Sequence, residues 1–451
     1  MRPEEIVSKL QDNGFEAYFV GGCVRDMILN IPFKDIDIST NATPDEIIKI
    51  FNDNKIKTFG KSFLVTLVDG YEISTFRIDK YNGFSDKDVE IKATKSAKED
   101  AIRRDLTINS IFYDPITKKI IDYVNGQDDL QKRIIRFNGN PIDRIREDPN
   151  RIIRACRFLA KIDGDFDDKT FEVLKTYSDY IETYVTKDRI RLEILKAMSI
   201  KNASLFFREL YNIGALKYIF PSLNNTYLED GGPYHEEYVF DHCMMSGDHC
   251  SVKYPLIKLA AYLHDVGKSI SKRINPKTNK VWFEGHEETG CDIIKIELED
   301  LRFSNEEINL ISNLILLHMR ISHERTSPKG VRRTLTKLND YNIPYRDLLR
   351  IAVCDKMGNY KSRKYYTIRN VYDLAKSFKE QVNSKNPVNQ FSDLKINGYD
   401  VMSITGLKPG KEVGEVLKHL FDLTIDDPEL NEKEKLIEIM KGLNNEEKNK
   451  V

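Results

Sequence analysis

Two aspartates near the N-terminus have the spacing of a metal-binding pair. Asp35 and Asp37 lie in the segment Phe33 to Ser39, whose alternating apolar residues predict a half-buried strand. Residues two apart on a strand point to the same face, so these carboxylates should repel each other unless a cation lies between them. Mg²⁺ binds carboxylate and phosphate oxygens, and paired ions can hold the attacking and leaving oxygens of a displacement. A solvated strand face is the alternative.

A glycine turn upstream of this pair favours the metal-site interpretation. Gly21 and Gly22 connect a predicted strand, Glu16 to Val20, with a predicted helix, Val24 to Asn30. Glycine lets backbone N–H groups approach a phosphate closely, and a helix N-terminus attracts anions. Glu72, on a neighbouring predicted strand, is a candidate third carboxylate, although an exposed strand residue explains it equally well. The pattern predicts a site that binds Mg²⁺ and a phosphate.

The charged segment from Glu147 to Lys161 predicts a helix that could select a base. Glu147, Arg151 and Arg154 share one face at helical spacing, and Asp148 and Arg151 can be neighbours. An ionised Asp only accepts hydrogen bonds, and Arg only donates them. Cytosine and adenine pair an amino donor with a ring-nitrogen acceptor, whereas uracil and guanine place a carbonyl where the amino group would be. The pair should therefore accept C and A, because an unpaired buried polar group costs ~1–3 kcal/mol. An intrahelical salt bridge is the alternative.

Histidines and aspartates of the second half form another candidate metal site. All eight histidines lie at or beyond His235, and several predicted helices carry them. The candidate ligands are His242, His264, Asp265, His286, His318 and Asp355. A helical bundle can point such groups into one core and bind one or two divalent metals, which would activate water against a phosphoester. We interpret the other four histidines as structural or surface residues: His235, His249, His323 and His419.

The elements that must position these residues divide the chain. Its 451 residues are too many for one core. Predicted strands and helices alternate at first, with a hairpin around Asp69 and Gly70, and after Pro141 the pattern is helical. Lys plus Arg number 70 against 71 Asp plus Glu, so a nucleic-acid surface must be local. The run from Gln131 to Lys161, with nine basic and three acidic residues, is one candidate.

Cysteine usage and hydropathy predict where the protein works. The six cysteines are scattered without a CxxC pair, which favours reduced thiols in the cytoplasm over a disulfide framework. The N-terminus is too polar for a signal peptide, and no apolar run reaches membrane-spanning length. We expect a soluble cytoplasmic protein without a membrane partner.

Together these motifs resemble the class II tRNA nucleotidyltransferase and bacterial poly(A) polymerase family. The matching segments are Gly21–Asp26, Lys34–Asp37, Arg103–Ser110, Glu147–Phe158, and Asp188–Ile190 with Glu193 and Lys196. They occur in the family's order and cover roughly the first half of the chain. The histidine and aspartate set resembles an HD-type metal phosphohydrolase domain, which some bacterial relatives carry in this position. Residues 398–402 and 406–410 also resemble the tail of such fused enzymes.

The resemblance implies a set of site residues. Catalytic roles fall on Asp35, Asp37 and Glu72, of which Asp35 and Asp37 bind Mg²⁺. Nucleotide-binding roles fall on Gly21, Gly22, Arg25, Asp26, Arg103, Arg104, Asp105, Asn109, Glu147, Asp148, Arg151, Arg154 and Arg157. The HD site would hold one or two divalent ions, and the candidate metals are Mn, Ni, Co, Fe and Mg. The family's flexible loop, Tyr81 to Asp88 here, lacks the usual Arg and Pro.

The resemblance also implies a fold and an activity. We expect an α+β protein with a polymerase-beta-like α/β head at 1–137, an all-α neck at 138–225, an HD helical bundle at 226–380 and a helical tail at 390–451. The implied activity is addition of C and A to tRNA 3′ ends from CTP and ATP without a nucleic-acid template, with HD phosphohydrolase activity. A poly(A) polymerase, or a relative adding only CC or only A, is the alternative. In a different class, the head would only regulate an HD phosphohydrolase by binding nucleotide.

Overall fold

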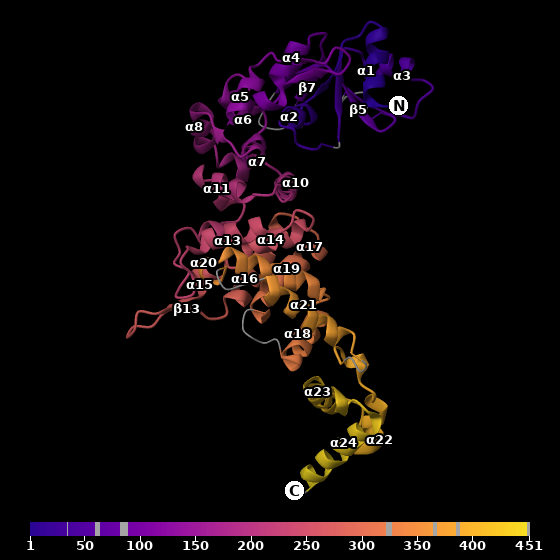
Figure 1. The fold of residues 1–451 in the computed structure, drawn as a ribbon, viewed down its shortest axis with the longest axis vertical. Helices are drawn as coiled ribbons and strands as arrows, with labels where there is room; N and C mark the ends of the chain where they lie inside the picture. Colours follow the sequence, from indigo (N-terminus) through magenta and orange to yellow (C-terminus); the bar gives the residue numbers. More distant parts are fainter. Residues whose placement is uncertain are drawn as a thin grey trace. The chain divides into compact units, whose positions relative to one another are not determined.

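The computed structural model describes residues 1–33, 35–58, 64–81, 89–321, 327–363, 368–384 and 388–448. Two compact units divide the chain, Met1–Pro221 and Ser222–Val451 (Figure 1). The division lies close to the expected boundary between neck and HD bundle. The finer division into four parts stays a prediction. Lys34 and residues 82–88, which belong to the catalytic motif and the flexible loop of the sequence analysis, lie outside the described residues.

The first unit contains a mixed seven-stranded sheet. Its strand order is β3-β4-β5-β2-β1-β8-β9. The strands are β1 (Ala17–Val20), β2 (Asp37–Thr40), β3 (Ile56–Thr58), β4 (Val65–Val68), β5 (Tyr71–Thr75), β8 (Phe112–Asp114) and β9 (Lys119–Ile121). Strand β2 runs antiparallel to β1 and parallel to β5. A separate antiparallel pair joins β6 (Arg77–Tyr81) to β7 (Val89–Ala93). The expected α+β class is confirmed.

Four helices belong to this part of the first unit. They are α1 (Pro3–Asp12), α2 (Gly22–Ile28), α3 (Pro44–Ile50) and α4 (Ala97–Arg103). Two of them, α2 and α4, contribute residues to the site described below. The expected hairpin is confirmed: β4 and β5 pair through Asp69 and Gly70, both with positive φ, as a two-residue turn matching the sheet twist requires. Helix α2 begins at Gly22, two residues earlier than expected, so the second glycine of the turn is already helical.

Strand β2 is shorter than the sequence analysis predicts. Its ladder starts at Asp37, which pairs with Val20 of β1 and Glu72 of β5. Residues before Asp37 have no partner on β1, because β1 ends at Val20 and the chain turns into α2. The prediction that Asp35 lies within the strand is therefore wrong, and Asp35 lies just before it.

The rest of the first unit is helical. Its main helices are α5 (Gly126–Lys132), α6 (Pro141–Glu147), α7 (Arg151–Ile162), α8 (Asp168–Thr176), α10 (Lys187–Ala197) and α11 (Ser204–Asn212). The single helix predicted from Glu147 to Lys161 is wrong, since α6 ends and α7 begins within it. Asp148 has φ −151° and ψ 97°, because a residue before proline, here Pro149, is driven out of the helical region. Ile152, Cys156 and Leu159 form an apolar stripe on α7 that is buried in the core.

The second unit is a helical bundle followed by a smaller helical group. The bundle contains α13 (Val239–His249), α14 (Pro255–Leu263), α15 (Lys268–Ser271), α16 (His286–Asp300), α17 (Asn305–Leu317), α18 (Pro328–Asp340), α19 (Tyr345–Gly358), α20 (Tyr360–Arg363) and α21 (Ile368–Val382). A hairpin of β12 (Lys272–Ile274) and β13 (Val281–Phe283) projects from it (Figure 1). The last helices, α22 (Gly398–Thr405), α23 (Lys411–Asp426) and α24 (Lys433–Lys448), pack around a core of their own. None of the described helices is both long and apolar enough to cross a bilayer.

Candidate functional site

A cavity of about 450 Å³ in the first unit collects most of the predicted nucleotide-binding residues. The turn between β1 and α2 forms one side of it, and β6, the end of α4 and the start of α7 form the others. Its lining includes eight cationic side chains: Arg25, Arg77, Arg103, Arg104, Arg151, Arg154, Arg157 and Lys161. Four carboxylates also line it: Asp37, Asp79, Asp105 and Asp148. The excess of positive charge suits a polyphosphate, because guanidinium groups bind phosphate oxygens bidentately.

The glycine turn and Asp37 lie together in this cavity, as the sequence predicts. Gly21 has φ +77°, a conformation that favours glycine. A Cβ added there would lie 3.7 Å from Nη1 of Arg104 and 4.0 Å from Oδ2 of Asp37. The backbone of the turn is thus placed beside both a carboxylate and a guanidinium. A phosphate at this turn would meet backbone N–H groups and Arg104 together.

The acidic groups near Asp37 repel one another. Asp37 and Glu72 are in register on parallel strands, so their side chains share a face. Burial raises the pKa of Asp37, and the charge of Asp35 adds to this while Arg104 opposes it. Burial also raises the pKa of Glu72, and the charge of Asp37 adds to it. This unbalanced negative charge fits a site that gains stability from a divalent cation.

The three predicted catalytic carboxylates are not brought together equally. Asp37 lines the cavity, whereas Asp35 and Glu72 do not belong to its lining. Within the described part of the chain, sets of three ligand atoms lying within 4.8 Å of one another occur only in the second unit. Of the three, only Asp37 is thus placed at the cavity.

Buried ion pairs hold the centre of the cavity in place. The Asp105 carboxylate accepts hydrogen bonds from Nε and Nη2 of Arg154, at 2.9 and 2.5 Å, and from the backbone N–H of Leu106. Burial alone would raise the pKa of Asp105, but the charge of Arg154 lowers it well below its usual range. Asn109 donates to Asp105 and accepts a hydrogen bond of 2.6 Å from Nη1 of Arg25. One network thus connects the glycine turn to α7.

Asp148 and Arg151 both line the cavity, but each is held by a different partner. Asp148 accepts hydrogen bonds from Nη2 of Arg189 at 2.7 Å and from the backbone N–H of Asn150. Arg151 donates to Oε2 of Glu147 at 2.6 Å and lies over the ring of Tyr81. The backbone N–H of Arg151 donates to the carbonyl oxygen of Asp148 at 3.0 Å, but no hydrogen bond joins their side chains within the described residues. The carboxylate of Asp148 and the guanidinium of Arg151 are therefore fixed near each other, and both can still form hydrogen bonds with a ligand in the cavity.

Two predicted nucleotide-binding residues, Asp26 and Glu147, lie outside the cavity lining. Asp26 accepts hydrogen bonds from Nε of Arg25 and Nζ of Lys161, both at 2.8 Å. Glu147 lies behind Arg151, because α6 ends at Glu147 and the chain turns before α7. Both carboxylates orient a cation that does line the cavity, so the structure gives them a positioning role.

Sequence reasoning missed several lining residues. Arg77, Asp79 and Tyr81 come from β6, and Phe158 and Lys161 come from α7. The signal for the first three was available, since residues two apart on a strand share a face. Lys161 lies four residues after Arg157 in the basic run from Gln131 to Lys161. Its spacing in this run did not distinguish it from the other basic residues as part of the site. Its partner Asp26 is 135 positions away.

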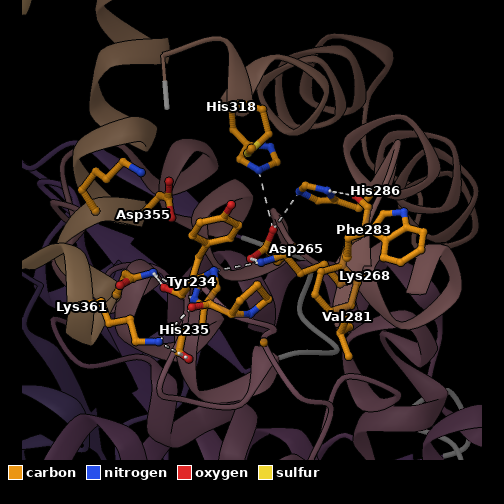
Figure 2. A pocket seen from close by; sticks show the side chains of 16 residues that line it. Tyr234, His235, Asp265, Lys268, Val281, Phe283, His286, His318, Asp355 and Lys361 are labelled. Carbon is orange, nitrogen blue, oxygen red and sulfur yellow. Dashed lines mark hydrogen bonds and ion pairs between the residues drawn. The ribbon is translucent and has the colours of Figure 1, made fainter. Parts of the chain in front are cut away.

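The six candidate ligands of the second unit come together as predicted. The Nε2 atoms of His242 and His264 lie 3.1 Å apart, and Oδ1 of Asp355 lies 3.1 Å from Nε2 of His242. Asp265 reaches both sides of the cluster: its Oδ2 lies 3.4 Å from His264, and its Oδ1 lies 3.3 Å from His286. The last ligand, His318, has its Nε2 at 3.7 Å from Oδ1 of Asp265 (Figure 2).

The imidazole rings are oriented for metal binding. Nδ1 of His264, His286 and His318 lies 2.6–2.9 Å from the carbonyl oxygen three residues earlier in each case. A carbonyl only accepts, so Nδ1 carries the proton and the lone pair of Nε2 faces the cluster. Nε2 of His286 is buried without a hydrogen-bond partner among the described residues. Burial alone would lower the pKa of His242, but hydrogen bonds to Asp355 and Glu237 raise it to about 9.

Four of these six residues, Asp265, His286, His318 and Asp355, form the floor of a cavity of about 520 Å³. His235 lines the cavity, so our interpretation of it as a structural or surface residue is wrong. It lies 2.7 Å from Oε1 of Glu237 and 3.2 Å from Nζ of Lys268. It also belongs to one of three overlapping sets of metal-ligand atoms, with His242 and Asp265. The sequence did not indicate that His235 belongs to this site, because it lies in a loop and helical spacing therefore does not relate it to the other residues.

Three segments of the chain match known protein families. Residues 17–136 match the poly A polymerase head domain. Residues 165–226 match the probable RNA- and SrmB-binding site of polymerase A. Residues 288–440 match a family described as tRNA nucleotidyltransferase domain 2, putative. The matches occur in the order head, RNA-binding region, second domain.

Curated relatives and solved structures match nearly the full chain. The CCA-adding enzyme of Staphylococcus epidermidis is 28% identical over 96% of this chain and 95% of its own length. That of Ligilactobacillus salivarius is 29% identical over 97% and 95%. The Bacillus stearothermophilus CCA-adding enzyme in complex with CTP has the same fold, with a TM-score of 0.69 and 21% identity over 100% of both chains. The Thermotoga maritima CCA-adding enzyme complexed with tRNA has a TM-score of 0.54 and 20% identity over 98% and 96%.

The head domain match, the full-length relatives and the arrangement of the cavity agree with one another. The cavity contains Gly21, Asp37, Asp105 and Arg154 from the motifs described above, and the first three of these lie within the head domain match. Residues 17–136 carry the poly A polymerase head domain, and over nearly its full length the chain is similar to CCA-adding enzymes.

Proposed function

We propose that this enzyme adds C and A to the 3′ end of tRNA, using CTP and ATP without a nucleic-acid template. One observation carries the proposal: the cavity of the first unit joins the glycine turn and Asp37 to Asp148 and Arg151. A group that can bind phosphate, a catalytic carboxylate and a pair suited to a base edge thus share one space. The relatives that match nearly the full chain are CCA-adding enzymes, which supports the same activity.

Base choice would rest on Asp148 and Arg151. Asp148 faces the cavity as an acceptor, and Arg189 and Asn150 fix its orientation. Arg151 faces it as a donor and is fixed by Glu147. Cytosine and adenine offer a donor and an acceptor in the matching order, whereas uracil and guanine would oppose two acceptors at Asp148. The protein itself would then provide the template.

Chemistry would take place at the opposite end of the cavity. Asp35 and Asp37 are the residues that would hold Mg²⁺, and the ion would supply charge neutralisation at the triphosphate. Arg104, beside the glycine turn, would bind a phosphate, and the Asp105 network would hold the nucleotide relative to α7. Positioning and charge account for most catalysis in such transfers, so little proton transfer by the protein is needed.

An incorporation assay tests this proposal. Full-length enzyme is given each of the four nucleotides with a tRNA that lacks its 3′ end, and the products are sequenced. We expect C and A to be added, and Asp35→Ala and Asp37→Ala to abolish incorporation. Asp53→Ala, which removes an exposed carboxylate of the same unit, should retain it. Products ending in poly(A), CC only or A only would replace CCA addition by the corresponding alternative, and no incorporation would leave only a nucleotide-binding head.

We also propose that the second unit is a metal-dependent phosphohydrolase of the HD type. The observation that favours it is the set of six candidate ligand groups that lie together, four of them at the floor of a cavity, with the Nε2 atoms of His264, His286 and His318 facing the cluster. Divalent ions bound there would activate water and polarise a phosphoester. Removal of a terminal or cyclic phosphate from RNA ends would prepare them for nucleotide addition. The six free cysteines support the cytoplasmic location expected from the sequence.

Phosphate release tests this second activity. Wild-type enzyme with Mn²⁺, Ni²⁺, Co²⁺ or Mg²⁺ should hydrolyse phosphoesters, and His264→Ala with Asp265→Ala should abolish this activity while incorporation continues. Asp37→Ala should show the reverse pattern. Undetectable hydrolysis by the wild type with all four metals would contradict the proposal without affecting the first.

A further inference from the structure

We propose that Tyr234 and Lys356 make the cavity of the second unit specific for nucleoside phosphates, with Tyr234 stacking on the base and Lys356 binding the phosphate. This inference rests on the proposed phosphohydrolase site and names the chemical class that it takes. Both residues line the cavity whose floor contains Asp265, His286, His318 and Asp355. Neither belongs to the ligand set, and the sequence analysis assigned no role to either.

Tyr234 is an exposed aromatic ring on a fixed loop. Its side chain is 79% exposed, although it lines a cavity. The loop backbone is held from α19 and α20: Asn359 donates to the carbonyl oxygen of Tyr234 at 3.2 Å, and Lys361 donates to that of Pro233 at 2.9 Å. Figure 2 shows the ring of Tyr234 projecting into the cavity between the side chains of Asp355 and Lys268. Because the backbone that carries it is held and the ring itself is uncovered, the ring is available to stack on a flat ligand.

The loop is also packed tightly against the projecting hairpin. A Cβ added at Gly232 would lie 3.0 Å from Cε2 of Phe283, which is on β13. Phe283 lines the same cavity, and Nζ of Lys268 lies 5.5 Å from the centre of its ring. The upper wall of the cavity is therefore aromatic and apolar, whereas its floor is charged. A ligand with a flat apolar part and an anionic part matches these two surfaces.

Lys356 supplies an uncommitted positive charge. It follows the ligand Asp355 on α19 and lines the cavity, and among the described residues it has no hydrogen-bond or ion-pair partner. The other lysines of the cavity are already engaged: Lys268 lies 2.6 Å from Oδ2 of Asp265, and Lys361 donates to backbone carbonyls. An unpaired ammonium next to a metal-ligand cluster suits a phosphate oxygen.

These features distinguish a nucleoside phosphate from other phosphoesters. A sugar phosphate or inorganic phosphate could use Lys356 and the metal ligands but would leave Tyr234 uncovered. A nucleotide uses both, and base–aromatic stacking is worth ~1–3 kcal/mol, or about 5- to 150-fold in affinity. The stack requires an aromatic face but no particular base, so the site should accept any nucleobase.

The only tryptophan of the chain, Trp282, lines this cavity and provides a binding signal. Full-length protein is titrated with adenosine 3′-phosphate, ribose 5-phosphate and inorganic phosphate, in EDTA and again with Mg²⁺, while tryptophan fluorescence is recorded. We expect the nucleotide to bind most tightly. Tyr234→Ala should weaken nucleotide binding by about 5- to 150-fold and leave ribose 5-phosphate unchanged, and Tyr234→Phe should bind as the wild type does. Lys356→Met should weaken all three ligands.

A matched control is Tyr372→Ala, which removes an exposed ring of α21 that does not line this cavity; it should bind as the wild type does. The inference is overturned if adenosine 3′-phosphate binds no more tightly than ribose 5-phosphate, or if Tyr234→Ala weakens both ligands equally. Because turnover is not measured, this failure leaves the proposed hydrolysis intact. Conversely, base-dependent binding without any hydrolysis would contradict the hydrolase and keep the specificity.

Discussion

Replacing Asp148 by asparagine should relax the choice of base more than it slows the reaction. Asp148 offers only acceptors to the cavity, with Oδ2 held by Arg189 at 2.7 Å and Oδ1 held by Asn150 at 3.1 Å. An amide keeps the size of the side chain but introduces N–H donors. Uracil then finds a donor for its carbonyl in place of a second acceptor. The mismatch that disfavours UTP costs ~1–3 kcal/mol, so discrimination of CTP over UTP should fall by about 5- to 150-fold.

The assay is kcat/KM for CTP and for UTP on a truncated tRNA, measured separately so that their ratio is obtained. Asp163→Asn is a matched control, because it makes the same chemical change at an exposed residue just after α7, where its partner is Arg133. That control should keep the wild-type ratio. If Asp148→Asn lowers both kcat/KM values equally and leaves their ratio unchanged, Asp148 does not read the base, and the account of selectivity given above is wrong.

Two predictions concern stability. The carboxylate of Glu297 accepts hydrogen bonds from Ser222, and burial raises its pKa to about 7. Because the pKa of the folded state lies above that of the unfolded state, the free energy of unfolding should fall by at most about 3 kcal/mol as pH rises from about 4.5 past 7. Urea unfolding of Glu297→Gln should no longer show this decrease. At Gly267 a Cβ would lie 2.1 Å from the carbonyl oxygen of His286, so Gly267→Ala should lower the Tm and weaken metal binding, whereas Gly290→Ala, with no contact under 3.3 Å, should have a smaller effect on both.

Local patterns were sufficient to predict much of the fold. The hairpin at Asp69 and Gly70 was readable because a two-residue turn with positive φ has its own sequence signature. The mainly helical character of the chain after Pro141 followed from apolar periodicity, which did not show the hairpin of β12 and β13. The errors lie where tertiary pairing or a proline decides a boundary. β2 starts at Asp37 because its partner β1 ends at Val20, and a single strand contains no information about its neighbour's length.

The candidate sites were predictable where one motif supplies neighbouring groups. The six candidate ligands lie close together as expected, because each lies on a helix of the bundle or in the turn that directly follows one. What the sequence could not show is which cation each carboxylate faces. Asp148 and Arg151 line the same cavity as expected, but the cation that the Asp148 carboxylate faces is Arg189, 41 positions away on α10. Such ion pairs depend on how helices pack against one another, which the periodicity of a single helix cannot predict.

Glu147 shows how an experiment can separate the two interpretations of this segment. The sequence analysis expects it to bind nucleotide directly, whereas the structure places it behind Arg151, with Oε2 at 2.6 Å from Nη1 of Arg151 and Oε1 at 2.5 Å from Nη2 of Arg144. Glu147→Gln keeps the side-chain volume but removes the charge that orients Arg151. A hydrogen bond to a charged group contributes ~1.5–3 kcal/mol, so the KM for CTP and for ATP should rise together, by about tenfold or more. Because Asp148 is untouched, the ratio of CTP to UTP incorporation should not change. A change in that ratio with KM for CTP unaltered would mean that Glu147 itself contacts the base, and the positioning role would have to be abandoned.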